Sequence, residues 1–184
     1  MTTTAAGHVV LVGPMGVGKT TVGRLVAEAL GVPLRDSDLD LHRNARDIAR
    51  AEGVEALHRL EADHLLAALD GAEPAVIAAA ASVVDDERGL VRLHEPFVAW
   101  LQAEPGLLMG RIARGHRQGD HRRDLGDDPA AAIAALADRR DPLYRQVADV
   151  VVAVDGRPPE DIATKIVAAT ARGPLTTNPL TTDR

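Results

Sequence analysis

The sequence predicts an α/β fold in which a parallel sheet is covered by helices on both faces. Short apolar runs alternate with longer helical segments along most of the chain, which is the pattern of consecutive βαβ units. The chain has 184 residues, of which 46% are hydrophobic and 26% charged, so it can bury one sizeable core without a metal or a cross-link. One domain is therefore expected.

The expected strands are short apolar runs, and the expected helices lie between them. A C-capping glycine, Gly31, follows the first helix, and Gly53 separates two others. The alanine-rich third strand is equally compatible with a helix. The predicted strands are His8–Val12, Val32–Asp36, Ala75–Ala80, Pro96–Leu101 and Asp149–Val154. The predicted helices are Gly18–Leu30, Asp38–Ala51, Val54–Leu69, Pro105–Arg114, Pro129–Arg140 and Pro159–Ala171.

Composition excludes several classes of function. The chain has no cysteine, which excludes thiolate catalysis, disulfides and cysteine-based metal sites. It has three aromatic residues and a net charge of −6, which argue against a nucleic-acid platform and against non-specific binding to DNA or to a membrane. No apolar run approaches the roughly 18 residues of a membrane span, and no signal peptide is evident. We therefore expect a cytoplasmic protein.

Two segments depart from the alternating pattern. Gly115–Asp128 is polar, dotted with glycine and basic in its first half, and is expected to be a mobile surface loop. The C-terminal segment repeats PLTT twice, which is too few copies for a repeat fold. Residues 1–172 are therefore expected to form the single domain, and residues 173–184 a disordered tail.

The sequence GPMGVGKT (Gly13–Thr20) matches the phosphate-binding loop pattern G-x-x-x-x-G-K-[ST] between a predicted strand and a predicted helix. Gly13, Gly16 and Gly18 allow the backbone N–H groups to surround a phosphate, and the helix dipole favours the same anion. Lys19 is expected to reach the β- and γ-phosphates, and Thr20 to ligate Mg²⁺. Lys19 is one of only two lysines among 21 basic residues, which makes it a marked choice. Val17 and Thr21 are expected to complete the nucleotide site.

The motif Asp36-Ser37-Asp38 ends the second predicted strand, where ligands bind in doubly wound sheets. Alternate residues of an extended chain point the same way, so both carboxylates could face the nucleotide. One could hold Mg²⁺ through water, and the other could accept the proton of an attacking hydroxyl. The alternative is that Asp38 only caps the next helix.

Together with these motifs, three stretches resemble the shikimate kinase family: residues 13–41, LHRLEADHLLAAL (Leu57–Leu69) and RRDPLYRQVADVVV (Arg139–Val152). The resemblance covers roughly residues 8 to 171. It implies a P-loop, nucleoside-monophosphate-kinase-like fold of three layers, with a five-stranded parallel sheet and a mobile lid at about residues 112–128. It also implies transfer of the γ-phosphoryl group of ATP, with Mg²⁺, to the 3-hydroxyl of shikimate.

The resemblance also assigns roles by position. Asp36 would support Mg²⁺, and Asp38 would bind the acceptor hydroxyls and act as the candidate base. Arg111, with Pro159 on the other face, would flank the adenine. Arg123, or its neighbour Arg122, would be the lid arginine, in a basic cluster that also contains Arg111, Arg114 and Arg117. Arg140 would grip the acceptor carboxylate, and Glu61 would orient a neighbouring arginine.

The chain departs from the family pattern on the acceptor side. His58 stands where the family has a second carboxylate-binding arginine, and imidazole cannot clamp a carboxylate with two parallel hydrogen bonds. Ala79, Ala80 and Ala81 replace three glycines, and each adds a methyl group to the expected pocket floor. His58 and Ala80 are nevertheless expected to line the substrate site.

Three hypotheses follow. The first is an ATP- and Mg²⁺-dependent kinase for shikimate, expected to act as a monomer in aromatic amino acid biosynthesis. The second is a related kinase for an acceptor without a carboxylate, such as a cyclic polyol or a sugar-like alcohol. The third is a nucleotide-binding pseudo-enzyme that acts through a partner, against which the retained Lys19, Thr20, Asp36 and Asp38 argue.

Overall fold

The computed structural model describes residues 7–41, 45–117 and 125–172. Its centre is a five-stranded parallel sheet of order β2-β3-β1-β4-β5, as expected for βαβ units. The strands are β1 (Val9–Val12), β2 (Leu34–Asp36), β3 (Val76–Ala78), β4 (Phe97–Gln102) and β5 (Val150–Ala153). They match the five predicted strands to within two residues at each end.

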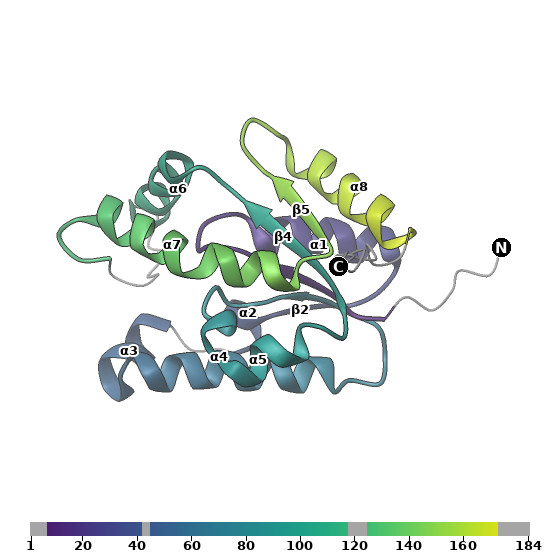
Figure 1. Cartoon of the computed structure of the whole chain (residues 1–184), viewed down its shortest axis with the longest axis horizontal. Helices are drawn as coiled ribbons and strands as arrows, with labels where there is room; N and C mark the ends of the chain where they lie inside the picture. The colour runs from purple at the N-terminus through teal and green to yellow at the C-terminus, as the bar shows by residue number, and fades with distance from the viewer. Residues whose placement is uncertain (1–6, 42–44, 118–124, 173–184) are drawn as a thin grey trace, which may run out of the picture.

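Helices cover both faces of the sheet (Figure 1). On one face, β1 and β4 pack against α1 (Lys19–Leu30), α6 (Pro105–Arg117) and α8 (Pro159–Thr170). On the other face they pack against α4 (Val54–Leu69) and the C-terminal part of α7 (Pro129–Val147). Trp100, at the centre of β4, is fully buried on this second face. The two-sided burial explains why the strands are continuous apolar runs.

Three of the predicted helices differ from the structure by more than one residue. The single helix expected at Asp38–Ala51 is two helices, α2 (Ser37–Asp40) and α3 (Ala45–Glu52). The carboxylate of Asp40 accepts hydrogen bonds from Arg35 and from the distant His64, so tertiary contacts hold this end of α2. Helix α6 extends to Arg117, so the first three residues of the expected surface loop, Gly115–Arg117, are helical.

Helix α7 continues past Pro142 to Val147, although proline usually ends a helix. The buried side chain of Tyr144 explains this continuation. Its hydroxyl donates to the backbone oxygen of Ala81 at 2.6 Å, and its ring packs against Trp100 with centroids 5.8 Å apart. Burial of this turn compensates for the lost backbone hydrogen bond.

A short 3₁₀ helix, η1 (Val83–Asp85), and helix α5 (Glu87–Arg92) lie between β3 and β4, where the sequence predicted no element. Asp86 caps α5 through hydrogen bonds from the backbone N–H groups of Arg88 and Gly89. A side chain at Gly89 would approach the backbone oxygen of Val83 to 2.5 Å. The glycine that disfavours a helix in the sequence is therefore required by this close packing.

Residues 118–124, within the predicted lid, and residues 173–184, the predicted tail, lie outside the described residues. None of the helices in the described part of the chain is long and apolar enough to cross a membrane.

Candidate active site

The phosphate-binding loop lies between β1 and α1, as predicted. Gly13 and Gly18 adopt φ values of 142° and 106°, in the region that favours glycine. The ammonium group of Lys19 donates to the backbone oxygens of Gly13 at 2.9 Å and Pro14 at 3.1 Å. The loop therefore has the strand–loop–helix arrangement that places backbone N–H groups and a helix N-terminus around an anion.

A cavity of about 450 Å³ opens beside this loop. It is lined by almost all the residues that the sequence singles out for ligand binding, which come from seven separate segments of the chain. The predicted site residues that line it are Gly16, Val17, Gly18, Lys19, Thr20, Thr21, Asp36, Asp38, His58, Ala80, Arg111, Arg140 and Pro159. Gly13 does not line the cavity and instead shapes the loop from behind.

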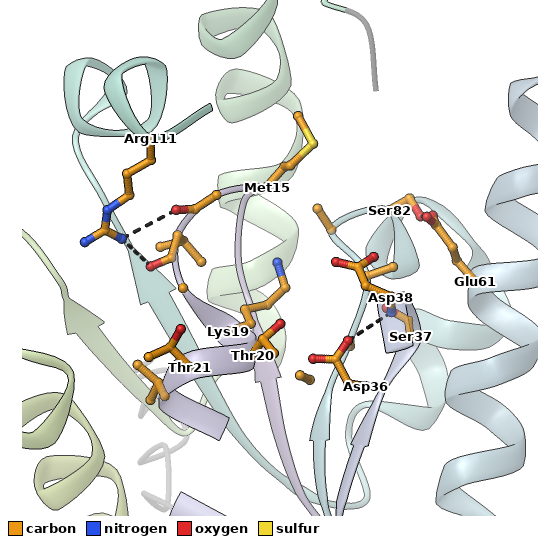
Figure 2. Close-up of a pocket in the computed structure, with 18 of the residues that line it drawn as sticks. Met15, Lys19, Thr20, Thr21, Asp36, Ser37, Asp38, Glu61, Ser82 and Arg111 are labelled. Atoms are coloured by element: carbon orange, nitrogen blue, oxygen red, sulfur yellow. Dashed lines mark hydrogen bonds between the residues drawn. The ribbon is translucent and has the colours of Figure 1, made fainter. Parts of the chain in front are cut away.

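The two carboxylates of the Asp-Ser-Asp motif face the loop from the end of β2 (Figure 2). Asp36, not Asp38, caps α2: its Oδ1 accepts the backbone N–H groups of Asp38 at 2.9 Å and Leu39 at 3.4 Å. The interpretation of Asp38 as a helix cap is therefore wrong. Capping by Asp36 leaves the Asp38 carboxylate directed into the cavity beside Lys19 (Figure 2).

Asp36 also fits a magnesium site. Its side chain is buried, and its second oxygen, Oδ2, has no hydrogen-bond partner among the described residues. A buried carboxylate oxygen without a partner is costly, so the site is suited to a ligand. With the nearby hydroxyl of Thr20, it supplies the hard oxygen donors that Mg²⁺ prefers alongside water and phosphate.

The acceptor side of the cavity is formed by α4 and by the segment after β3. Glu61 accepts a hydrogen bond from the hydroxyl of Ser82, where the family resemblance implied an arginine partner. Burial raises the pKa of Glu61, the charge of Asp38 adds to this effect, and the Ser82 hydrogen bond opposes it. Ala80 is buried and His58 is partly buried, and both line this end of the cavity.

Arg140, on α7, is the guanidinium at the acceptor end. It is only 6% exposed, and its Nε and Nη2 atoms donate to the carboxylate of Asp85 at distances down to 2.6 Å. The sequence predicted Arg140 but not this partner. The signal available in the sequence was a pair of acidic residues, Asp85 and Asp86, shortly after a predicted strand.

Arg111 lies on the opposite side of the phosphate loop from the carboxylates (Figure 2). Its Nη1 donates to the backbone oxygens of Val17 at 2.7 Å and Gly16 at 3.4 Å. Pro159, at the start of α8, lines the same cavity. Arg114 and Arg157 line it as well, and Arg157 was not predicted; the proline-rich turn before α8 carries it. Arg122 and Arg123 lie outside the described residues.

One cavity joins the phosphate loop to an acceptor end lined by His58, Ala80 and Arg140. Together with the sheet order, this arrangement defines a P-loop kinase for a small molecule. The sequence model of the family described as shikimate kinase matches residues 15–171. A shikimate kinase of Symbiobacterium thermophilum is 42% identical over 166 residues, covering 87% of this chain and 94% of the relative. One of Pseudomonas syringae pv. tomato is 36% identical over 175 residues, covering 91% and 98%.

The structure agrees with the sequences. A shikimate kinase from Acinetobacter baumannii, solved in complex with shikimate, superposes with a TM-score of 0.82 at 28% identity, covering 92% of this chain and 96% of that one. The chain belongs to the shikimate kinase family.

Proposed function

We propose that this protein transfers the γ-phosphoryl group of ATP to a hydroxyl group of shikimate. The observation that carries the proposal is that one cavity joins the phosphate loop, the Asp36–Asp38 pair and the buried guanidinium of Arg140. Membership of the family supports ATP as donor and shikimate as acceptor. Because ATP is an intracellular nucleotide, we also propose a cytoplasmic location. We further propose that the protein acts as a monomer.

On the nucleotide side, the loop N–H groups and Lys19 bind the phosphates, and Arg111 with Pro159 flanks the adenine. The hydrogen bonds from Nη1 of Arg111 to the backbone oxygens of Gly16 and Val17 hold this side chain beside the loop. Thr20 and Asp36 hold Mg²⁺, which, when bound, neutralises charge on the phosphate oxygens.

On the acceptor side, the hydroxyl oxygen of the acceptor bonds to the γ-phosphorus, and Asp38 accepts the proton that this hydroxyl loses. The bond from that phosphorus to the β,γ-bridging oxygen breaks, and ADP leaves. Arg140 binds the acceptor carboxylate, and the predicted lid arginine, Arg123 or its neighbour Arg122, adds positive charge over the transferring group. Lys19 stabilises the same charge from the loop.

The test is the release of ADP from ATP and Mg²⁺ in the presence and absence of shikimate. The expected result is shikimate-dependent turnover at about 1–100 per second. Lys19→Ala should abolish it. Lys165→Ala is the matched control, because Lys165 lies on α8 and does not line the cavity. ATP binding without stimulation by shikimate would refute the proposed acceptor.

His58 and Ala80 favour a second candidate, a kinase for a cyclic alcohol without a carboxylate. Both line the acceptor end, where His58 offers no fixed guanidinium fork and Ala80 adds a methyl group. A panel of uncharged cyclic polyols in the same assay distinguishes the two candidates, since turnover with a polyol but not with shikimate would favour the second.

A further inference from the structure

A carboxylate outside the cavity forms an ion pair with Arg140 at the acceptor end. Asp85, at the end of η1, accepts hydrogen bonds from Nε and Nη2 of Arg140 at 3.0 and 2.6 Å. It also accepts one from Nη2 of Arg139 at 2.9 Å. Arg140 lines the cavity, whereas Asp85 does not. Asp85 therefore acts on an acceptor through Arg140 and not by contact.

The ion pair with Asp85 lowers the net positive charge that Arg140 presents to an acceptor. Burial raises the pKa of Asp85, but the hydrogen bond and charge of Arg140 outweigh this, and Arg139 and His58 add to them, so the pKa lies below its ordinary value. Asp85 is thus ionised at neutral pH. Nε and Nη2 of Arg140 both donate to this carboxylate, which leaves the two N–H groups of Nη1 and the second N–H of Nη2 for an acceptor.

The other charged groups around Asp85 and Arg140 offset the negative charge of Asp85 only slightly. Arg139 has a side chain that is 57% exposed, so its charge is screened by solvent. Glu61 interacts with Arg140 from α4 and carries a raised pKa, and His58 faces Asp85 from the same helix. Among the described residues, the buried cation at the acceptor end is therefore Arg140, and it already has an internal counterion.

We propose that Asp85 is a specificity-determining residue that reduces the preference of the pocket for an anionic acceptor over an uncharged one of the same shape. The acceptors concerned are cyclic polyols with a carboxylate and their neutral analogues. Their kcat/KM values should differ less than they would with an unpaired arginine in the pocket. This inference rests on the proposed function, because it concerns the acceptor of the same site.

The test compares kcat/KM for shikimate with kcat/KM for its carboxamide in wild type and in Asp85→Asn. Asparagine keeps the size and one acceptor oxygen but removes the charge. The ratio in favour of the carboxylate should rise about tenfold or more, as expected for one charge a few ångströms away in a partly screened site. The KM for ATP should be unchanged.

Two further variants control for structure. Asp86→Asn is the matched control: Asp86 is the neighbouring residue, caps α5 and lies outside the cavity, so the ratio should stay at its wild-type value. Asp85→Glu keeps the negative charge, so its ratio should stay closer to wild type than that of Asp85→Asn. Because the ratio compares two acceptors on one protein, a smaller folded fraction does not alter it.

The outcomes separate the inference from the proposed function. A ratio in Asp85→Asn that stays unchanged or falls, with shikimate turnover intact in wild type, overturns the inference alone. If Asp85→Asn does not fold, Asp85→Ser replaces it, and failure of both makes Asp85 a structural counterion and overturns the inference. Wild type that phosphorylates neither acceptor overturns the proposed function and the inference together.

Discussion

Replacing Gly13 with alanine should displace the phosphate loop, because the added Cβ atom would collide with the backbone of β4. A Cβ atom at this position would lie 2.4 Å from the backbone oxygen of Leu101. Ordinary contact begins at 3.4 Å, so the atoms must separate by about 1 Å. Leu101 is fully buried in β4, so the loop and not the strand has to move.

The size of the effect follows from two costs. The φ of 142° costs a side chain on the order of 1–3 kcal/mol, and a displacement of about 1 Å in a positioning group costs about 100-fold in rate. Lys19 is coupled to this shift, because its ammonium group is bonded to the backbone oxygens of Gly13 and Pro14. We expect Gly13→Ala to weaken ATP binding and to lower kcat/KM for ATP by roughly 100-fold.

The assay is calorimetric titration with ATP and Mg²⁺, together with steady-state kinetics. Gly106→Ala is the matched control, because Gly106 lies in α6 with no atom within 4 Å of an added Cβ. Alanine there should leave ATP affinity unchanged and raise stability by up to about 1 kcal/mol. If Gly13→Ala bound ATP within about threefold of wild type, the reasoning would be refuted.

Three further predictions concern the acceptor wall and the metal site. His58→Arg supplies a second guanidinium at the acceptor end and should lower the KM for shikimate roughly tenfold without changing the KM for ATP. An unchanged KM for shikimate in steady-state assays would contradict the hypothesis that His58 binds the carboxylate more weakly than an arginine would. Because burial raises the pKa of Glu61, the folded protein holds this proton more tightly than the unfolded chain, and stability is lost as the pH rises from about 4.5 through the folded pKa. The Tm difference between Glu61→Gln and wild type should therefore move in favour of glutamine between about pH 4 and pH 8 in thermal melts, and a constant difference would count against it. Asp36→Ala removes the cap of α2 and a proposed magnesium ligand, so it should cost about 0.5–2 kcal/mol of stability and raise the Mg²⁺ concentration needed for half-maximal turnover; an unaltered Mg²⁺ requirement would exclude Asp36 from the metal site.

The elements that the sequence predicted well have local causes. The glycine spacing of the phosphate loop, the C-cap at Gly31 and the apolar strands depend on neighbouring residues and on burial on both faces of the sheet. The predicted break after Arg140 was wrong for the opposite reason. Pro142 disfavours a helix locally, but the burial of Tyr144 against Trp100 and its hydrogen bond to Ala81 depend on segments far apart in the chain.

The candidate site divides in the same way. Lys19, Thr20, Asp36 and Asp38 lie in short motifs whose spacing alone implies phosphate and metal chemistry, and the cavity brings them together. The local role of Asp36 was not predictable: it caps α2, and its Oδ2 has no hydrogen-bond partner among the described residues. A sequence pattern names a residue type, whereas capping depends on the exact backbone path.

The sequence by itself determined the fold class, the nucleotide half of the site and the family, because these rest on local backbone conformation and on short spacings. Only the tertiary structure decided which groups balance the charges of the acceptor half. Ser82 meets Glu61 across 21 residues, and Arg140 meets Asp85 across 55. Hydrogen bonds and charges act through space, and their partners are set by how the helices pack on the sheet.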